Sequence, residues 1–152
     1  RTNLTGMYSN NSKAHTPYTT EQYLETEVLS ASPARLVQML YESAIQSISA
    51  AMDAIDAGDI ALRSQKIGKA VSIVNELATS LDKEKAGTWA RDLVELYDYM
   101  ARQLNQANFN QSKAPLVEVQ SLLGTLLEAW KSADHSEDES NPDVVVAIDQ
   151  VA

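Results

Sequence analysis

The residues of this 152-residue chain that could do chemistry are few and scattered. There is no Cys, which excludes a disulfide framework, a zinc ribbon, an iron–sulfur cluster and a thiol nucleophile together. The two histidines, His15 and His135, lie outside the four helices predicted below. A di-iron bundle needs Glu-x-x-His pairs on facing helices, and a phosphotransfer domain needs an exposed His on a bundle helix. Both chemistries are therefore disfavoured.

The stretch from Asp82 to Gly87 resembles the start of a calcium-binding EF-hand loop. Its fifth position would be Ala86 and its bidentate twelfth position would be Leu93, so two ligands are missing. Four carboxylates of the predicted helices lie among polar residues, as on a solvated face: Glu42, Glu76, Asp98 and Glu128. No Gly-rich phosphate loop or nucleophile elbow is present. The sequence therefore predicts a protein that is not an enzyme, with no cofactor and no metal.

The charge of the chain argues against several classes of partner. The 12 Lys and Arg against 21 Asp and Glu give a net charge of −9, and the basic residues are scattered rather than clustered as nucleic-acid binding requires. The net charge also does not favour an acidic polypeptide partner. The chain has neither a run of 18 apolar residues nor a signal peptide at its start. We therefore expect a cytoplasmic protein with no nucleic-acid partner and no stable membrane insertion.

The elements that must position these residues are four helices. Between residues 32 and 132 the apolar residues recur every three or four positions in four blocks. Ser32-Pro33 is a helix start, Gly58-Asp59 ends the first block and caps the second, Gly87-Thr88 makes the next turn, and residues 108–111 break the third block. Four helices joined by short turns run up and down, so we expect an all-α, antiparallel four-helix bundle.

The large aromatic residues of these helices are predicted to pack in the core rather than to bind a ligand, because they lie on the apolar stripes. They are Tyr41, Tyr97 and Trp130, with Met100 and Leu123 on the same stripes. Residues 23–133 are predicted to form the bundle domain. Residues 134–152 are acidic and are expected to be a disordered tail, and residues 1–22 a flexible arm, of which residues 1–6 precede Met7 and are interpreted as an expression remnant.

Five segments of the chain carry a recognisable pattern: Ser30-Ala31-Ser32-Pro33, Met39-Leu40-Tyr41-Glu42, Ser80-Leu81-Asp82, Leu96-Tyr97-Asp98-Tyr99-Met100 and Ala129-Trp130. Together these segments resemble one known family, the flagellar export chaperone FliS. The resemblance covers residues 23–131 in register. It implies a helical chaperone that binds the C-terminal segment of newly made flagellin, prevents premature polymerisation and delivers it to the export gate protein FlhA. An apolar surface that accepts helices is consistent with that role.

The same reasoning predicts which residues contact the partner. Eight are assigned to the flagellin groove and to an N-terminal arm or short helix packed on the bundle: Tyr8, Tyr18, Tyr23, Val28, Ile45, Ile48, Ile60 and Ile67. Aromatic residues in a polar arm often anchor in a pocket, so the arm is predicted to compete with the client for the groove. An uncovered groove would invite homodimers of the client-free protein. A helical adaptor or secretion chaperone for a different client stays an alternative.

Overall fold

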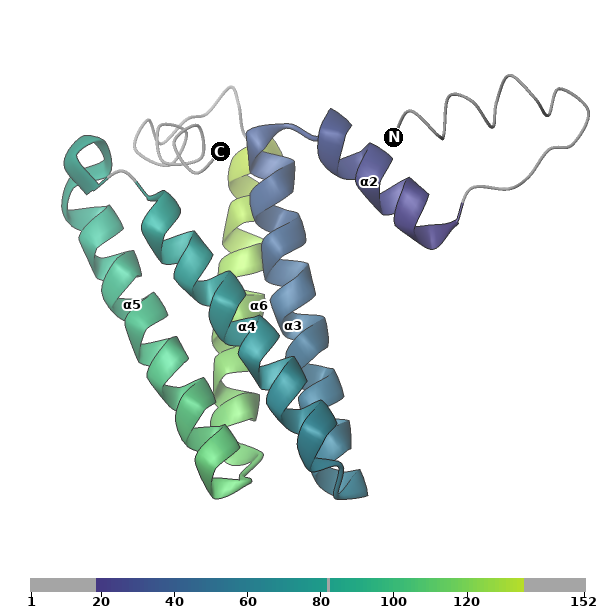
Figure 1. The fold of residues 1–152 in the computed structure, drawn as a ribbon. Coiled ribbons are helices and arrows are strands. Elements are labelled where there is room, and N and C mark those ends of the chain that lie inside the picture. Colours follow the sequence, from purple (N-terminus) through teal and green to yellow (C-terminus); the bar gives the residue numbers. More distant parts are fainter. Residues whose placement is uncertain (1–18, 82, 136–152) are drawn as a thin grey trace, which may run out of the picture. The chain divides into compact units, whose positions relative to one another are not determined.

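The structure, a computed structural model, describes residues 19–81 and 83–135. These residues form five helices: α2 (Thr20–Ser30), α3 (Pro33–Ala57), α4 (Ile60–Ser80), α5 (Lys83–Asn110) and α6 (Ala114–His135). They divide after Ala31 into two units, which are described separately. Helices α3 to α6 pack against one another as the predicted four-helix bundle (Figure 1).

Helix α2 is the short helix expected near the N-terminus, and it begins with a capping box. Thr19 Oγ1 accepts a hydrogen bond from the backbone N–H of Gln22 at 3.2 Å, and Gln22 Oε1 accepts one from the N–H of Thr19 at 2.8 Å. This exchange satisfies two donors near the helix start. The predicted boundary between arm and bundle, at residues 22 and 23, lies inside α2.

The start of α3 and the turn between α3 and α4 are fixed by residues that the sequence predicted for these positions. Ser32 caps α3, its Oγ accepting a hydrogen bond from the N–H of Arg35 at 3.2 Å. Gly58 ends α3 with φ at 70°, a left-handed conformation that glycine adopts at little cost. Asp59 then caps α4, its Oδ1 accepting from the N–H of Leu62 at 3.0 Å. Both predicted caps and the predicted turn are confirmed.

The predicted turn before the third bundle helix is also confirmed, although it lies within the bounds of α5. Gly87 interrupts that helix with φ at 65° and ψ at −143°, values that essentially only glycine adopts. The part of α5 that packs in the bundle therefore follows Gly87. At its far end Gln111 has φ at 53° and makes the turn into α6.

Helix α6 runs further than predicted, to His135. The tail was predicted to begin at residue 134, and both histidines were predicted to lie outside the helices. For His135 that prediction was wrong. The apolar stripe stops at Trp130, but residues 131–135 contain no Gly or Pro that would end a helix. His15 lies outside the described residues.

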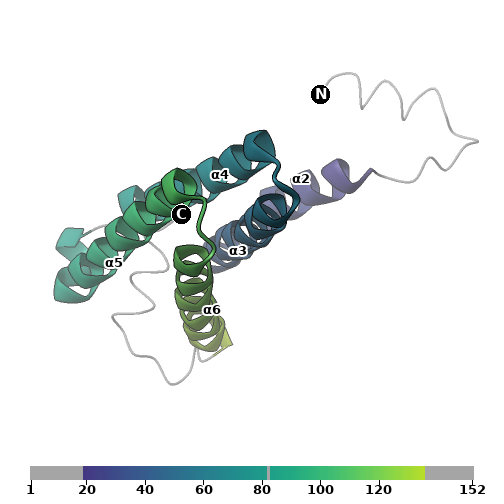
Figure 2. The same ribbon diagram turned by 90° about the horizontal axis from the view of Figure 1, so that it is seen from below.

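The four bundle helices form a ring in which each packs against two neighbours. Helix α3 packs against α4 and α6, and α5 packs against the same two (Figures 1 and 2). Among these four neighbouring pairs, α3 and α4 share the most extensive backbone contact, and α5 and α6 share the least extensive one. The buried surface of α3 includes four small residues that allow a close approach: Ala44, Ser47, Ala51 and Ala54.

The core of the bundle consists of the predicted apolar stripes. The side chains of Tyr41, Met100 and Leu123 are completely buried, and Tyr97 and Trp130 are 1% and 5% exposed. Their interpretation as core residues is therefore confirmed. Across the part of the chain that the structure describes, no helix combines the length and the apolarity that crossing a bilayer requires.

Candidate partner-binding surface

The half of the bundle where α3 begins contains a buried aromatic cluster. The hydroxyl groups of Tyr41 and Tyr97 are hydrogen-bonded to each other, and Trp130 Nε1 donates to the Tyr41 hydroxyl at 3.0 Å. The Trp89 ring meets the Trp130 ring edge-on, with centroids 5.8 Å apart. The cluster therefore joins α3, α5 and α6 through two hydrogen bonds that share the Tyr41 hydroxyl inside an apolar core.

Burial also sets the protonation of the two tyrosines. It raises the pKa of Tyr41 to about 12, against opposing hydrogen bonds from Tyr97 and Trp130. It raises the pKa of Tyr97 further, with the nearby Tyr41 adding to the effect. Both hydroxyls are therefore neutral at physiological pH. They act as hydrogen-bonding groups of the core rather than as an acid or a base.

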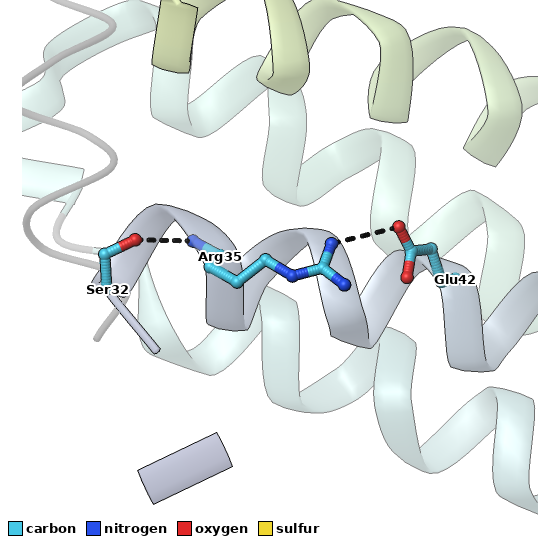
Figure 3. Close-up of polar contacts among 3 residues, drawn as sticks. All are labelled: Ser32, Arg35 and Glu42. Carbon is cyan, nitrogen blue, oxygen red and sulfur yellow. Dashed lines mark hydrogen bonds and ion pairs between the residues drawn. The ribbon is translucent and has the colours of Figure 1, made fainter. Parts of the chain in front are cut away.

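Polar contacts at the start of α3 hold the segment that resembles the family signature. Figure 3 shows Ser32 accepting from the backbone of Arg35, whose side chain extends along the helix to Glu42. Arg35 Nη1 and Glu42 Oε1 are 3.2 Å apart, and both side chains are about a third exposed. A pair this open to water contributes less than about 1 kcal/mol.

The structure places the predicted partner-binding residues in different environments. Tyr8 and Tyr18 lie outside the described residues, and Tyr23 and Val28 lie on α2. On the bundle, Ile45 is half-buried on α3, and Ile60 is 61% exposed at the start of α4. The side chains of both bundle residues therefore offer apolar surface to a partner.

Two of the predicted groove residues are corrected. Ile48 is completely buried and Ile67 is 1% exposed, so both are core residues. Ile48 lies seven residues after Tyr41, and Ile67 lies seven before Val74, which places each in line with another buried side chain. Neither side chain can meet a partner unless the bundle opens.

Three exposed apolar side chains of the bundle lie at the end opposite the aromatic cluster. Phe109 is 88% exposed near the end of α5, Val117 is 55% exposed in the first turns of α6, and Ile60 begins α4. Two polar contacts hold the helices together at this end. Lys113 Nζ pairs with Asp56 Oδ1 at 2.6 Å, and Arg63 Nε donates to Asn108 Oδ1 at 3.0 Å. The exposed apolar residues therefore belong to helix ends that polar contacts hold in place. Phe109 and Val117 were not among the residues predicted from the sequence to contact a partner.

Further apolar residues are half-buried along the outer seams, the lines where two neighbouring helices meet the surface. At the α5/α6 seam they are Trp89, Leu96, Leu122 and Leu126. The register follows from Tyr99, whose hydroxyl donates to Glu118 Oε1. Leu96 lies one helical turn before Tyr99, and Leu122 lies one turn after Glu118, both in the direction of the aromatic cluster. The two leucines are therefore at the same level of the bundle. They lie where two helices share the least extensive backbone contact of the four neighbouring pairs.

Together these observations define a class of protein. It is a four-helix bundle with a polar-linked aromatic core and with apolar side chains half-exposed along a wide seam, which is the kind of surface that binds amphipathic helices. Among the described residues, no three His, Cys, Asp or Glu side chains gather as a metal site.

Comparison with known proteins identifies the family. The family model "Flagellar protein FliS" matches residues 14–137. The chain is 40% identical over 109 residues to the flagellar secretion chaperone FliS of Salmonella typhimurium, covering 71% of this chain and 81% of that protein. It is 33% identical over 121 residues to the FliS of Bacillus subtilis, covering 80% and 88%. The chain therefore belongs to the FliS family of flagellar secretion chaperones, as the sequence resemblance predicted.

Proposed function

We propose that the chain is a cytoplasmic export chaperone that binds the C-terminal segment of flagellin, prevents its premature polymerisation and delivers it to the export gate protein FlhA. Family membership supports a flagellar client. The bound segment of flagellin is proposed to be disordered when free and helical when bound. The chaperone would then need only a suitable surface, with no chemical step, cofactor or metal.

The observation that carries this proposal is the α5/α6 seam. Leu96 and Leu122 are half-buried at the same level of two helices whose backbone contact is the least extensive of the four neighbouring pairs. An amphipathic client helix would cover these side chains and bury its own apolar face, so both partners would lose apolar surface to water. Ile45 on α3 and Ile60 on α4 would extend the client contact.

The proposal is tested by calorimetry with a peptide of the C-terminal segment of the cognate flagellin. Coupled folding and binding should give a negative heat-capacity change and a helical circular dichroism signal larger than the sum of the two components. A dissociation constant above about 100 μM, which corresponds to a binding free energy of roughly −5.5 kcal/mol, would count against flagellin as the client. That result would favour the alternative, a helical adaptor or secretion chaperone for a different client.

The N-terminal segment remains part of the proposal as a competitor of the client. Its anchors would be Tyr8, Tyr18, Tyr23 and Val28. A tethered competitor acts at an effective concentration of about 1 mM, so it would yield to a client that binds more tightly. Deleting residues 7–23 should promote dimers of the free protein, and client binding should increase hydrogen exchange in the arm. Unchanged client affinity in a monomeric deletion variant would exclude this role.

A further inference from the structure

Helix α4 differs in charge from the rest of the bundle. As described, it has three basic residues and one acid, Glu76, whereas α3 and α6 have more acids than bases and α5 has equal numbers. The three basic residues are Arg63, Lys66 and Lys69. In a chain with a net charge of −9, the charges of this helix sum to +2 (three basic residues less one acid).

The bundle does not neutralise this charge. Arg63 is 8% exposed and donates Nε to an uncharged acceptor, Asn108 Oδ1, at 3.0 Å. Within residues 19–81 and 83–135, no carboxylate forms an ion pair with Lys66 or Lys69, of which Lys66 is half-buried and Lys69 exposed. Both ammonium groups are therefore available to an external partner.

The acids of the neighbouring helix α3 point elsewhere. Asp56 pairs with Lys113, immediately before α6, and Glu42 pairs with Arg35 on its own helix. Asp53 lies eleven residues after Glu42, which brings both to nearly the same face of α3. The acids of α3 therefore lie away from α4, and the lysines of α4 have no ion-pair partner among the residues that the structure describes.

The position of the lysines on α4 follows from a second contact with α5. Ser64 Oγ hydrogen-bonds to Asn108 Oδ1 at 3.3 Å, so the Ser64 side of α4 faces α5. At about 100° per residue, Lys66 and Lys69 lie roughly 160° and 140° around the helix from Ser64. They therefore lie on the flank toward α3, where Leu62 is half-buried one turn before Lys66. In the ring of helices, this flank is on the opposite side of the bundle from the α5/α6 seam.

We infer that the α4 flank formed by Leu62, Lys66 and Lys69 binds an acidic amphipathic helix of the client, an inference that rests on the proposed function. Carboxylates one helical turn apart on the client would pair with the two lysines, and an apolar residue beside them would cover Leu62. The net charge of the chain disfavours an acidic partner at long range. Within about 8 Å, the Debye length at physiological salt, the α4 lysines reverse that effect. The client would thus contact two opposite sides of the bundle.

The test compares two charge-reversal variants of the full chain. The first is K66E/K69E on α4, and its matched control is R91E/R102E, which changes the net charge equally at two exposed positions of α5. The probe is a synthetic peptide of the C-terminal segment of the cognate flagellin, titrated at about 0.05 M and about 0.5 M salt. At low salt K66E/K69E should weaken binding about tenfold, and the control by less than about threefold. At high salt the difference should shrink to less than about twofold.

A second peptide, with its Asp and Glu replaced by Asn and Gln, completes a double-mutant cycle. K66E/K69E should bind this neutral peptide as tightly as the wild-type chain does. If K66E/K69E bound the acidic peptide as well as the wild type did, or no worse than the control, the inference would be overturned while the proposed function stood. If the wild-type chain bound neither peptide, the proposed function itself would fail and the inference with it.

Discussion

The two ends of the bundle use large apolar residues in opposite ways. Near the start of α3, Tyr41, Tyr97 and Trp130 are buried and joined by hydrogen bonds. At the other end, Ile60 and Phe109 are mostly exposed. The polar contacts there, such as that between Arg63 and Asn108, join neighbouring residues instead. One end contributes chiefly to the free energy of folding, and the other leaves apolar surface uncovered.

This difference shows how a small bundle combines a stable fold with exposed apolar surface. A hydrogen-bonded aromatic cluster fixes the relative positions of three helices, so the bundle does not need every apolar side chain to be covered. The contacts Lys113–Asp56 and Arg63–Asn108 then hold the open end without burying its apolar residues. The comparison predicts that substitutions at the two ends will separate stability from binding.

The largest effect is expected for Trp130→Ala. The substitution removes a ring that is 5% exposed, together with its hydrogen bond to Tyr41, so it should lower the free energy of unfolding by about 3 to 5 kcal/mol. Chemical denaturation followed by circular dichroism measures this. A loss below about 1 kcal/mol would mean that the aromatic cluster is not the stable end of the bundle.

The next effect is a loss of stability in alkali. The pKa of Tyr41 is raised by burial from 10.0 to about 12, so the folded chain keeps a proton that the unfolded chain releases. The stabilisation is complete below pH 10 and is lost as the pH rises toward 12. Its size is about 2 to 3 kcal/mol, from roughly 1.4 kcal/mol for each pKa unit. Denaturant titrations across this range should give a smaller pH dependence for Tyr41→Phe, and an equal dependence would contradict the assignment.

A smaller effect is expected for Tyr97→Phe. The ring stays in the core, but the hydrogen bond to the Tyr41 hydroxyl is lost, which should cost about 1 kcal/mol. The melting temperature should fall by a few degrees with the helix content unchanged. A gain in stability would indicate that desolvating the Tyr97 hydroxyl outweighs its hydrogen bond.

The smallest effect is expected at the open end. Phe109 is 88% exposed, so Phe109→Ser should change the free energy of unfolding by no more than about 0.5 kcal/mol. Denaturation under the conditions used for Trp130→Ala provides the comparison. A loss above about 1.5 kcal/mol would show that this side chain packs in solution and that the two ends do not differ in the way described.

Local signals in the sequence predicted most of the fold. Ser32, Gly58, Asp59 and Gly87 act within their own turns, so their roles could be inferred without knowing which helices become neighbours. The apolar stripes likewise follow from helical spacing alone. The end of α6 at His135 was missed because no strong stop signal follows Trp130.

The surface was predicted less well because exposure depends on packing between helices. In a four-helix bundle the apolar stripe of each helix is wide, and the neighbouring helix decides which flank is covered. Spacing alone therefore could not separate the buried Ile48 and Ile67 from the half-buried Ile45. Phe109 offered a signal that was overlooked, because five residues after Leu104 it lies about 140° away from the buried stripe of α5.

The central claim, that the α5/α6 seam binds the client while the residues beneath it hold the fold, is tested most directly at two adjacent positions of α5. Tyr97 is buried and Leu96 is half-buried on the seam. The measurement is calorimetric titration of the flagellin C-terminal peptide into Leu96→Gln and Tyr97→Phe, with the thermal melt of each variant alongside. Leu96→Gln should weaken peptide binding by about tenfold, or about 1.4 kcal/mol, whereas Tyr97→Phe should bind normally and melt earlier. Normal binding by Leu96→Gln together with weakened binding by Tyr97→Phe would contradict the account.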